Sequence, residues 1–396
     1  WLKSLAQVIS PNNAAFFLLL LSPMGASASP CFAGIQPLPG PTAAEPLRIA
    51  ISGAAGQIGY SLLPMIAKGD MFGPRQRIIL RCLDLNIPRV KQNMEGIKME
   101  MQDGYFPLLV EQQVIFSTSD RDAFKDADYA ILLGAFPKQN DMKQEDFWEK
   151  NVMIFRTMGN AINQYAKESC RVLVVGQPVN TNAAICAKYA DKIPKSNITT
   201  LSRLDHNRAV GILATKTGVP VQEVRNVIIW GGLTTKPICC DLQLCAIGGK
   251  PIADVLSSAD DQKWLKETFP DKLQKRGQDI MTARQASSAL SAARAIVSHM
   301  SDMFFGRRSG EVMSMGIHSS GNPYSIQSDL YYSFPVRLTG RGSYQIVKGL
   351  DLSMEVREKM VEQEKALAAE KAIVAKICGQ PQHATVESTD RKPSQL

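Results

Sequence analysis

A glycine-rich loop at residues 53–59 has the composition and spacing of a phosphate-binding segment. It reads GAAGQIG, follows the short apolar stretch 48–52 and opens a stretch with helical spacing over 59–67. Glycines there permit a tight turn and let backbone N–H groups approach a pyrophosphate, which the start of the following helix attracts. The pattern predicts a nucleotide site made by a strand, a loop and a helix. Its predicted residues are Gly53, Gly56, Gln57, Ile58 and Gly59.

An acidic residue, Asp84, closes the second predicted strand at residues 77–83. A carboxylate at that point is placed to accept hydrogen bonds from ribose hydroxyls. Its negative charge also repels the 2′-phosphate of NADP. Asp84 therefore favours NAD as the nucleotide. A second interpretation, in which the glycine loop is kept only for the turns that the fold requires, stays open.

Apolar strands alternate with helical segments through the first half of the chain. Further strands are expected at 113–117, 127–133 and 171–175, the last one after a long helical stretch over 142–168. Such alternation predicts a parallel sheet with helices on both of its faces. The fold class is therefore α/β, with a dinucleotide-binding domain over residues 46–200.

After about residue 200 the alternation weakens, and a second, mixed α/β domain is expected over 201–378. It includes helices near 204–217, near 281–300 and over 353–377, with a polar tail at 379–396. The helix near 281–300 is rich in small residues, which suits close packing between helices. The helix over 353–377 consists mostly of good helix formers with one apolar face.

Composition excludes several classes of protein. The chain of 396 residues with 45% apolar residues is long enough to bury two packed domains. Its net charge of +8 comes from scattered basic residues, which argues against nucleic-acid binding. The eight cysteines include a cluster at positions 239, 240 and 245, but no histidine lies nearby and no CxxC spacing appears. No metal site is therefore predicted.

Residues 1–45 differ from the rest of the chain. Lys3 is the one charged residue before Glu45, and the apolar run at 16–21 is interrupted by Pro23. This run is too short to span a membrane, which needs about 20 residues. We interpret the segment as a targeting extension or an extended assembly arm. Together with a pI near 9.0, it predicts an organellar protein, in a mitochondrion rather than a plastid.

Beyond the glycine loop, residues 46–378 resemble a malate dehydrogenase of the cytosolic/NADP-dependent type. The resemblance is carried by ordered motifs: GAAGQIG at 53–59, GA at 134–135, PVNTN at 178–182, RLDHNR at 203–208, KRG at 275–277 and GNPY at 321–324. It implies a Rossmann-type domain, a substrate domain of the lactate/malate dehydrogenase type, a homodimer, and interconversion of malate and oxaloacetate. It also adds Gly134, Ala135 and Asn180 to the nucleotide site.

The resemblance also implies which groups should do the chemistry. In the family, a histidine held by an aspartate moves the hydroxyl proton, and arginines hold the substrate carboxylates in two-pronged pairs. Asp205 matches the orienting aspartate and Arg208 matches the arginine of the substrate domain. The position of the histidine, however, is occupied by Leu233. A leucine carries no proton, so the base is missing.

Three further positions depart from the family pattern. The two arginines of the mobile loop are replaced by Lys138 and Gln144, and the asparagine before the proline at 178 is replaced by Gln177. A lysine offers a point charge rather than a planar fork. Loss of a general acid–base group alone removes a factor of about 10²–10⁴ in rate. We therefore expect a degenerate member without ordinary malate turnover.

Two histidines are candidates to replace the missing base. His318 lies in a loop that the family places near the substrate cleft, although a structural histidine is the plainer interpretation. His206 is adjacent to Asp205 and should face another direction on the helix. Without a histidine partner, Asp205 is expected to pair with Arg208 or with Lys236.

The sequence thus predicts a catalytically inactive, malate dehydrogenase-like protein that can still bind NAD. It would serve as a structural or regulatory subunit of a larger organellar assembly, as a homodimer or heteromer formed through the dimer face of the family. A module that reads NADH without turning it over is an intermediate hypothesis. The rival is an active NAD-dependent malate or 2-hydroxy acid dehydrogenase with altered specificity.

Overall fold

The computed structural model describes residues 45–139, 141–232, 236–307 and 310–379. The predicted leader up to residue 44 and the predicted tail from residue 380 lie outside these residues. Leu233 lies outside them as well.

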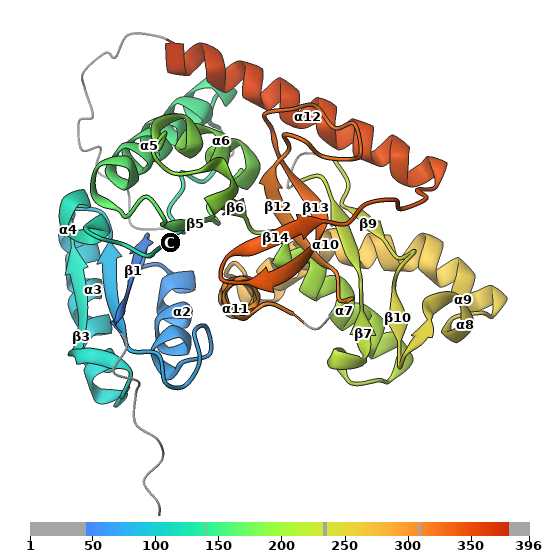
Figure 1. Ribbon diagram of the computed structural model, residues 1–396, viewed down its shortest axis with the longest axis horizontal. Coiled ribbons are helices and arrows are strands. Elements are labelled where there is room, and N and C mark those ends of the chain that lie inside the picture. The colour runs from blue at the N-terminus through green and yellow to red at the C-terminus, as the bar shows by residue number, and fades with distance from the viewer. Residues whose placement is uncertain (1–44, 140, 233–235, 308–309, 380–396) are drawn as a thin grey trace, which may run out of the picture. The chain divides into compact units, whose positions relative to one another are not determined.

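A nine-stranded sheet in the order β14-β13-β12-β6-β5-β4-β1-β2-β3 is the centre of the fold (Figure 1). Its parallel part comprises β1 (Leu47–Ser52), β2 (Ile78–Leu83), β3 (Leu109–Ser117), β4 (Tyr129–Leu132), β5 (Arg171–Val174) and β6 (Ile198–Thr200). The antiparallel part comprises β12 (Met313–His318), β13 (Tyr331–Gly340) and β14 (Ser343–Ile346). The predicted α/β class with a parallel, Rossmann-type sheet is confirmed.

Helices cover both faces of the parallel strands. Successive strand residues point to opposite sides, so apolar side chains lie on both faces and are buried by helices. Ile49 and Ile51 of β1 pack into one apolar core, whereas Ala50 packs into the other. The first core also takes residues from α2 (Gln57–Lys68), α3 (Pro88–Asp103) and α11 (Leu290–Phe305). The second takes residues from α4 (Asp120–Phe124), α5 (Gln144–Tyr165) and α6 (Val179–Tyr189).

The second half of the chain adds two small sheets and further helices. One sheet contains β7 (Val224–Arg225), β10 (Ala246–Ile247) and β11 (Lys250–Pro251), and the other contains β8 (Ile228–Trp230) and β9 (Cys239–Asp241). The helices are α7 (Arg203–Thr217), α8 (Ile252–Val255), α9 (Ala259–Lys263) and α10 (Phe269–Arg284). The predicted single helix near 281–300 is wrong: α10 ends at Arg284, Gln285 has a left-handed backbone with φ of 52°, and α11 starts at Leu290.

The long helix α12 (Met354–Gly379) joins distant parts of the fold. It contacts α5 and α6, and it also contacts β9 (Figure 1). Buried Gln363 donates to the carbonyl of Pro237 at 2.7 Å, and Thr181 donates to Glu370. The end of the β8–β9 loop and the start of α6 are thereby both fixed to one helix.

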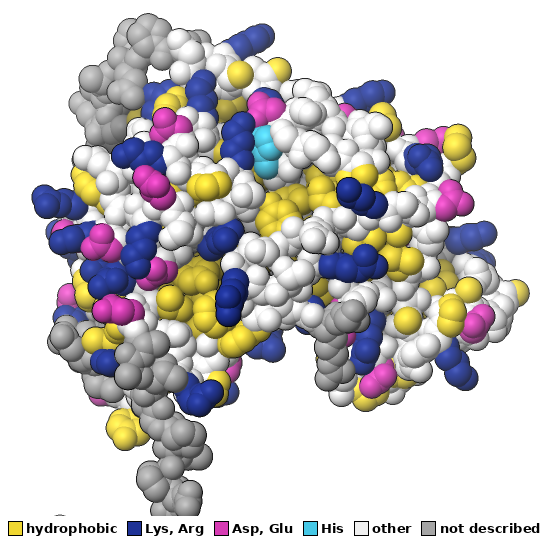
Figure 2. All heavy atoms as spheres, in the orientation of Figure 1, with side chains coloured by type: hydrophobic (Ala, Val, Ile, Leu, Met, Phe, Trp, Pro, Cys, Tyr) yellow, Lys and Arg dark blue, Asp and Glu magenta, His cyan; other side chains and the backbone are white. Residues whose placement is uncertain are grey.

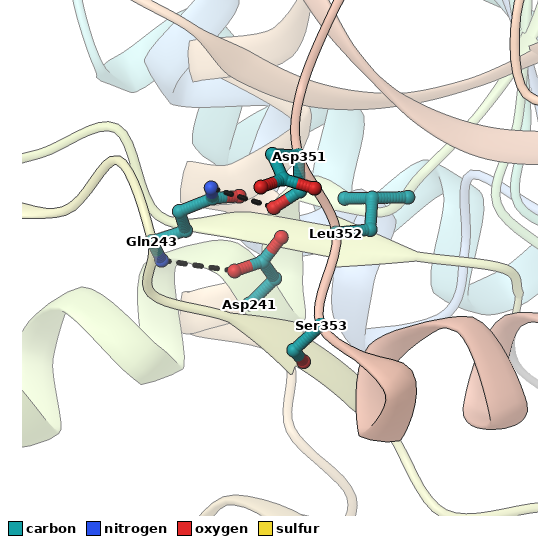
Figure 3. Close-up of a pocket in the computed structure, with 5 residues that line it drawn as sticks. All are labelled: Asp241, Gln243, Asp351, Leu352 and Ser353. Atoms are coloured by element: carbon teal, nitrogen blue, oxygen red, sulfur yellow. Dashed lines mark hydrogen bonds between the residues drawn. The ribbon is translucent and has the colours of Figure 1, made fainter.

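A hollow of about 300 Å³ lies between β9 and the segment before α12 (Figure 3). Oδ1 of Asp241 accepts from the backbone N–H of Gln243 at 2.9 Å, and Gln243 Nε2 donates to the carbonyl of Asp351 at 2.7 Å. The other oxygen of Asp241 accepts from Trp230 Nε1 at 3.2 Å. Both oxygens of Asp241 thus have donors, and the hydrogen bond from Gln243 to Asp351 joins the end of β9 to the segment before α12.

Charged side chains are mixed over the face of the molecule seen in Figure 2. Figure 2 shows Lys and Arg side chains dispersed over the visible face with Asp and Glu between them. Within the described residues, no helix is long and apolar enough to cross a membrane, and no group of three or more His, Cys, Asp or Glu is placed to hold a metal ion.

Candidate functional site

The glycine loop is packed so tightly that side chains at two positions would collide with backbone. Gly53 has φ of +70°, and a Cβ there would lie 2.8 Å from the nitrogen of Gly134. A Cβ at Gly59 would lie 2.1 Å from the carbonyl oxygen of Ala54. Both contacts are shorter than atoms allow, so glycine is required at both positions. The backbone of the loop can therefore come close to a ligand bound at the carboxyl ends of β1 and β4.

The start of α2 presents unshielded N–H groups. Its N-cap is Gly56, which supplies no side-chain hydrogen bond. The first N–H groups of a helix have no partner within the helix, so those of Gln57 and Ile58 remain available as donors. Such donors, together with the helix dipole, favour an anionic group such as a pyrophosphate.

Asp84 is bonded directly to the glycine loop. Its Oδ2 accepts from the N–H of Ala55 and its Oδ1 from the N–H of Leu85, both at 2.8 Å. The carbonyl of Ala55 in turn accepts from Asn93 Nδ2 at 2.7 Å. The carboxylate is thus held at the end of β2, where ribose hydroxyls would meet its free lone pairs and a 2′-phosphate would meet its charge. These residues fit NAD.

The other predicted nucleotide residues follow neighbouring strands of the same sheet. Gly134 and Ala135 come after β4, and Asn180 comes after β5 at the start of α6. Ligands of open parallel sheets bind at this carboxyl edge of the strands. Asn180 is buried and donates from Nδ2 to the carbonyl of Tyr331 at 2.8 Å, whereas its Oδ1 has no partner among the described residues.

A small cavity lies next to Asn180, where the structure brings residues from several distant segments together. Its volume is about 10 Å³, roughly that of one water molecule. It is lined by Val179, Asn180, Leu201, Ser202, Asp205, Ile229, Gly232, Ile238 and Ser333. Among these residues, Asp205 is the one with an ionisable side chain. The cavity is otherwise apolar or neutral.

Asp205 is paired with Arg208, as one of the two predicted alternatives had it. Arg208 Nη1 donates to Asp205 Oδ1 at 3.0 Å, and the two side chains are 15% and 5% exposed respectively. Burial raises the pKa of Asp205, and the charge and hydrogen bond of Arg208 lower it in part. Arg208 Nη2 also donates to Ser288 Oγ at 3.3 Å, while its buried Nε has no partner in the described part of the chain.

The two altered loop positions contact each other. Lys138 Nζ donates to Gln144 Oε1 at 2.8 Å, and both side chains are exposed. The stem of this loop is fixed to α5, because Asn151 bonds to both the N–H and the carbonyl of Phe136 at 3.1 Å. Gln177 is exposed and precedes Pro178 through a cis peptide bond. None of these three altered residues lines the cavity.

The histidines of the described chain are engaged elsewhere. His206 Nδ1 lies 3.2 Å from Ser314 Oγ on β12, so it faces away from Asp205 as predicted. Burial lowers the pKa of His206 well below its usual value, and that of His299, bonded to Thr199, to about 3. His318 lies 3.0 Å from Asp329 and does not line the cavity. The position of the family base, Leu233, lies outside the described residues.

Two polar residues of the cavity, Ser202 and Ser333, were not predicted from the sequence. Ser333 of β13 enters the site through its backbone bonds with Gly231 and its Oγ, which donates to the carbonyl of Ile229 at 2.7 Å. Ser202 directly precedes α7. Neither has a local motif, although Ser202 adjoins the RLDHNR segment and could have been included for that reason.

Two family models together cover most of the chain. Residues 47–199 match the NAD binding domain of lactate/malate dehydrogenases, and residues 202–377 match their alpha/beta C-terminal domain. The chain belongs to the lactate/malate dehydrogenase family. Within that family, the glycine loop and Asp84 lie in the matched NAD binding domain, and Asp205 and Arg208 lie in the matched C-terminal domain.

Individual family members are similar over nearly their full lengths. The cytoplasmic malate dehydrogenase of Taenia solium is 45% identical over 309 residues, which is 77% of this chain and 90% of the relative. The crystal structure of malate dehydrogenase from Naegleria fowleri has a TM-score of 0.77 at 38% identity, covering 84% of this chain and 99% of that one. Trichomonas vaginalis lactate dehydrogenase in complex with NADH and oxamate has a TM-score of 0.76 at 35% identity, covering 85% and 100%.

The names of the relatives correct one prediction. Cytoplasmic malate dehydrogenases from several animals and a plant are among the relatives, at 43–45% identity. The prediction of an organellar, mitochondrial location is therefore wrong. It relied on the basic pI and the acid-free leader. Both are weak indicators of location, because neither is by itself a targeting signal.

Proposed function

We propose that this member of the lactate/malate dehydrogenase family binds NAD(H) and does not interconvert malate and oxaloacetate at an ordinary rate. One observation carries the proposal: the described lining of the cavity holds a single titratable side chain, Asp205, and Arg208 neutralises it. The degenerate sequence at positions 233, 138 and 144 supports it.

Nucleotide binding is supported by the backbone of the first domain. The loop at 53–59, the unshielded start of α2 and the fixed carboxylate of Asp84 offer the contacts that a pyrophosphate and a ribose require. Bound NADH would supply a hydride to a carbonyl carbon. The residues proposed to hold it are Gly53, Gly56, Gln57, Ile58, Gly59, Asp84, Gly134, Ala135 and Asn180.

The missing element is a group that moves a proton. Reduction of a 2-oxo acid places negative charge on the carbonyl oxygen, and a positioned acid must neutralise it. His206, His299 and His318 have other partners, and the sequence has a leucine at the position of the family base. Loss of this group is expected to cost a factor of about 10²–10⁴ in rate.

We further propose how the chain is used. Residues 46–200 would form the nucleotide domain and residues 201–378 the substrate-type domain of a homodimer or heteromer that has a structural or regulatory role in a larger assembly. The names of the relatives favour the cytosol as its location. A protein with an intact nucleotide site could bind NADH in proportion to its concentration without oxidising it, and so act as an NADH sensor.

A second candidate function is an active NAD-dependent 2-hydroxy acid dehydrogenase with altered specificity. It is favoured by the likeness to both a malate and a lactate dehydrogenase of known structure, at 38% and 35% identity. Asp205 and Arg208 would then be its remaining catalytic and substrate residues.

One experiment separates the two functions. NADH binding to the full chain is measured by fluorescence titration, and NADH oxidation is then followed with oxaloacetate, pyruvate and other 2-oxo acids. Binding without oxidation is expected. Oxidation with any one of these acids would establish the second function, and absence of binding would contradict both.

A further inference from the structure

We propose that Asn93 of α3 is a positioning residue for the nucleotide site. Its side chain holds the carbonyl of Ala55 away from the place of the pyrophosphate and so keeps the glycine loop in the conformation that binds it. The inference rests on the proposed function, because it takes residues 53–59 to bind the pyrophosphate of NADH. It adds a residue that lies outside the glycine-loop motif.

The backbone N–H groups of the loop fall into two sets. Those at positions 53–56 all have acceptors: the first two donate to the carbonyl of Leu83, the third to Asp84 Oδ2 and the fourth back to the carbonyl of Gly53. Those at positions 57–59 have no acceptor among the described residues. The donors left for a pyrophosphate are therefore the first three N–H groups of α2.

The carbonyl of Ala55 is close to these donors in the chain, so its direction matters for an anion. A carbonyl oxygen carries partial negative charge and would repel a pyrophosphate that it faced. Asn93 Nδ2 donates to this oxygen at 2.7 Å, while the N–H of Ala55 donates to Asp84 Oδ2 at 2.8 Å. Because peptide groups are planar, these two contacts fix the peptide planes before and after Ala55.

The side chain of Asn93 reaches the loop without being part of the core. The buried face of α3 consists of Met94, Ile97 and Met101, and Asn93 is exposed. Asparagine is also a weaker helix former than alanine, so helix stability does not account for it at this position. Replacement of Asn93 should therefore leave the core intact, and nucleotide affinity is the property that it should control.

The effect on affinity follows from the conformations open to the free loop. Without the hydrogen bond from Asn93, the peptide after Ala55 can rotate, and part of the population has its carbonyl turned toward the anion. Affinity then falls in proportion to the fraction that stays competent to bind. A neutral hydrogen bond sets this factor at about 2–12. Adenosine lacks the phosphates that meet the N–H groups of α2, so its affinity should not depend on Asn93.

The probes are NADH, ADP and adenosine, bound to the full chain. NADH is measured by fluorescence titration, and the other two by displacement of bound NADH. Asn93→Ala should weaken NADH and ADP about five- to tenfold and leave adenosine affinity and the melting temperature unchanged. Asn93→Asp has the same size but no N–H donor, and its charge should weaken both phosphate ligands further. Asn93→Gln keeps an amide donor and should bind NADH more tightly than Asn93→Ala.

Gln92→Ala and Gln92→Asp are the matched controls, because Gln92 is the exposed neighbour of Asn93 on α3 and points in another direction. Both should bind all three ligands within about twofold of the wild type, since an exposed charge farther from the ligand is screened.

Three results would overturn the proposal: NADH binding by Asn93→Ala as tight as by the wild type, a loss of adenosine affinity equal to that of ADP, or a fall in melting temperature together with all three affinities. Failure of the proposed function gives a different result. A wild-type chain that binds none of the three ligands contradicts both, whereas one that oxidises NADH with a 2-oxo acid contradicts the proposed function alone.

Discussion

The glycine loop and the cavity beside α7 lie at the same edge of the parallel sheet, yet they depend on different parts of the chain. The loop uses backbone: two glycines without room for a Cβ, N–H groups at the start of α2, and one carboxylate bonded to a peptide N–H. The cavity uses side chains, of which Asp205 and Arg208 satisfy each other. The first arrangement fits a nucleotide, and in the second the described cavity lining offers one ionisable side chain, Asp205, which is paired with Arg208.

Under the proposed function, the nucleotide site is kept while the catalytic site is lost. A Cβ at Gly59 would collide with the loop after β1, and a Cβ at Gly53 would collide with the backbone after β4, so the loop is constrained by folding as well as by binding. A side chain that serves catalysis alone has no such constraint. Under the proposed function, leucine at the position of the family histidine would remove the proton-transfer group without requiring a different backbone.

The largest expected effect is a gain of activity. Leu233→His combined with Lys138→Arg and Gln144→Arg should raise the rate of NADH oxidation with oxaloacetate by about 10²-fold or more over the wild-type chain, since it restores a proton donor and two planar carboxylate partners. Steady-state absorbance at 340 nm measures it. The matched control has Leu233→Asn in place of Leu233→His and should remain inactive. Equal rates in the two variants would show that position 233 is not where the base acts.

The next effect tests the backbone of the loop. Gly59→Ala should destabilise the fold by about 1–3 kcal/mol and abolish NADH binding, because its Cβ would overlap the carbonyl of Ala54. Thermal unfolding and NADH titration measure the two results. Gly211→Ala on α7, where a Cβ meets nothing within 4 Å, should change stability by at most about 1 kcal/mol and in the stabilising direction. Equal behaviour of the two variants would contradict the packing argument.

A smaller effect is expected at Asp84. Asp84→Ser removes the acceptor for the N–H of Ala55 and should weaken NADH binding by about 1–3 kcal/mol. NADPH binding should weaken less, because the charge facing a 2′-phosphate is also removed. Fluorescence titration with both nucleotides tests this prediction. Asp260→Ser, on the exposed start of α9, serves as the control and should leave both affinities unchanged.

The smallest effect is expected at Asp329, far from the chemistry. Partial burial raises the pKa of this carboxyl, but hydrogen bonds from Lys195, Lys371 and His318 outweigh it and hold the pKa below its usual range. Asp329 is 53% exposed, so Asp329→Asn should cost only about 0.5–1 kcal/mol at pH 7. Since the folded-state pKa is lowered, this difference should shrink as pH falls below about 4. Denaturant unfolding at pH 7 and pH 3.5 measures it, and NADH affinity should not change.

Much of the first domain could be predicted because its signals are local. The strands at 48–52 and 77–83 and the loop between them follow from apolar runs and glycine spacing in neighbouring residues. The pairing of Asp205 with Arg208 could be foreseen from their spacing of three on a helix. The break between α10 and α11 could not, because no glycine or proline marks it: the left-handed residue there is the exposed Gln285.

The cavity lining was harder to predict because it is assembled from distant segments. Ser333 reaches Ile229 from β13, and Gln363 of α12 reaches Pro237. These contacts depend on the register of the strands and on the position of α12, a helix of 26 residues. No local sequence motif predicts either of them. The departure from the family pattern at position 233, by contrast, is visible in the sequence alone.

The most direct test of the account is NADH oxidation by the full chain with oxaloacetate, run beside the variant Leu233→His/Lys138→Arg/Gln144→Arg under conditions in which titration shows both to bind NADH. The account predicts binding by both and oxidation by the variant alone. Oxidation by the unmodified chain at a rate within about tenfold of the variant would contradict it and would require another residue to act as the base.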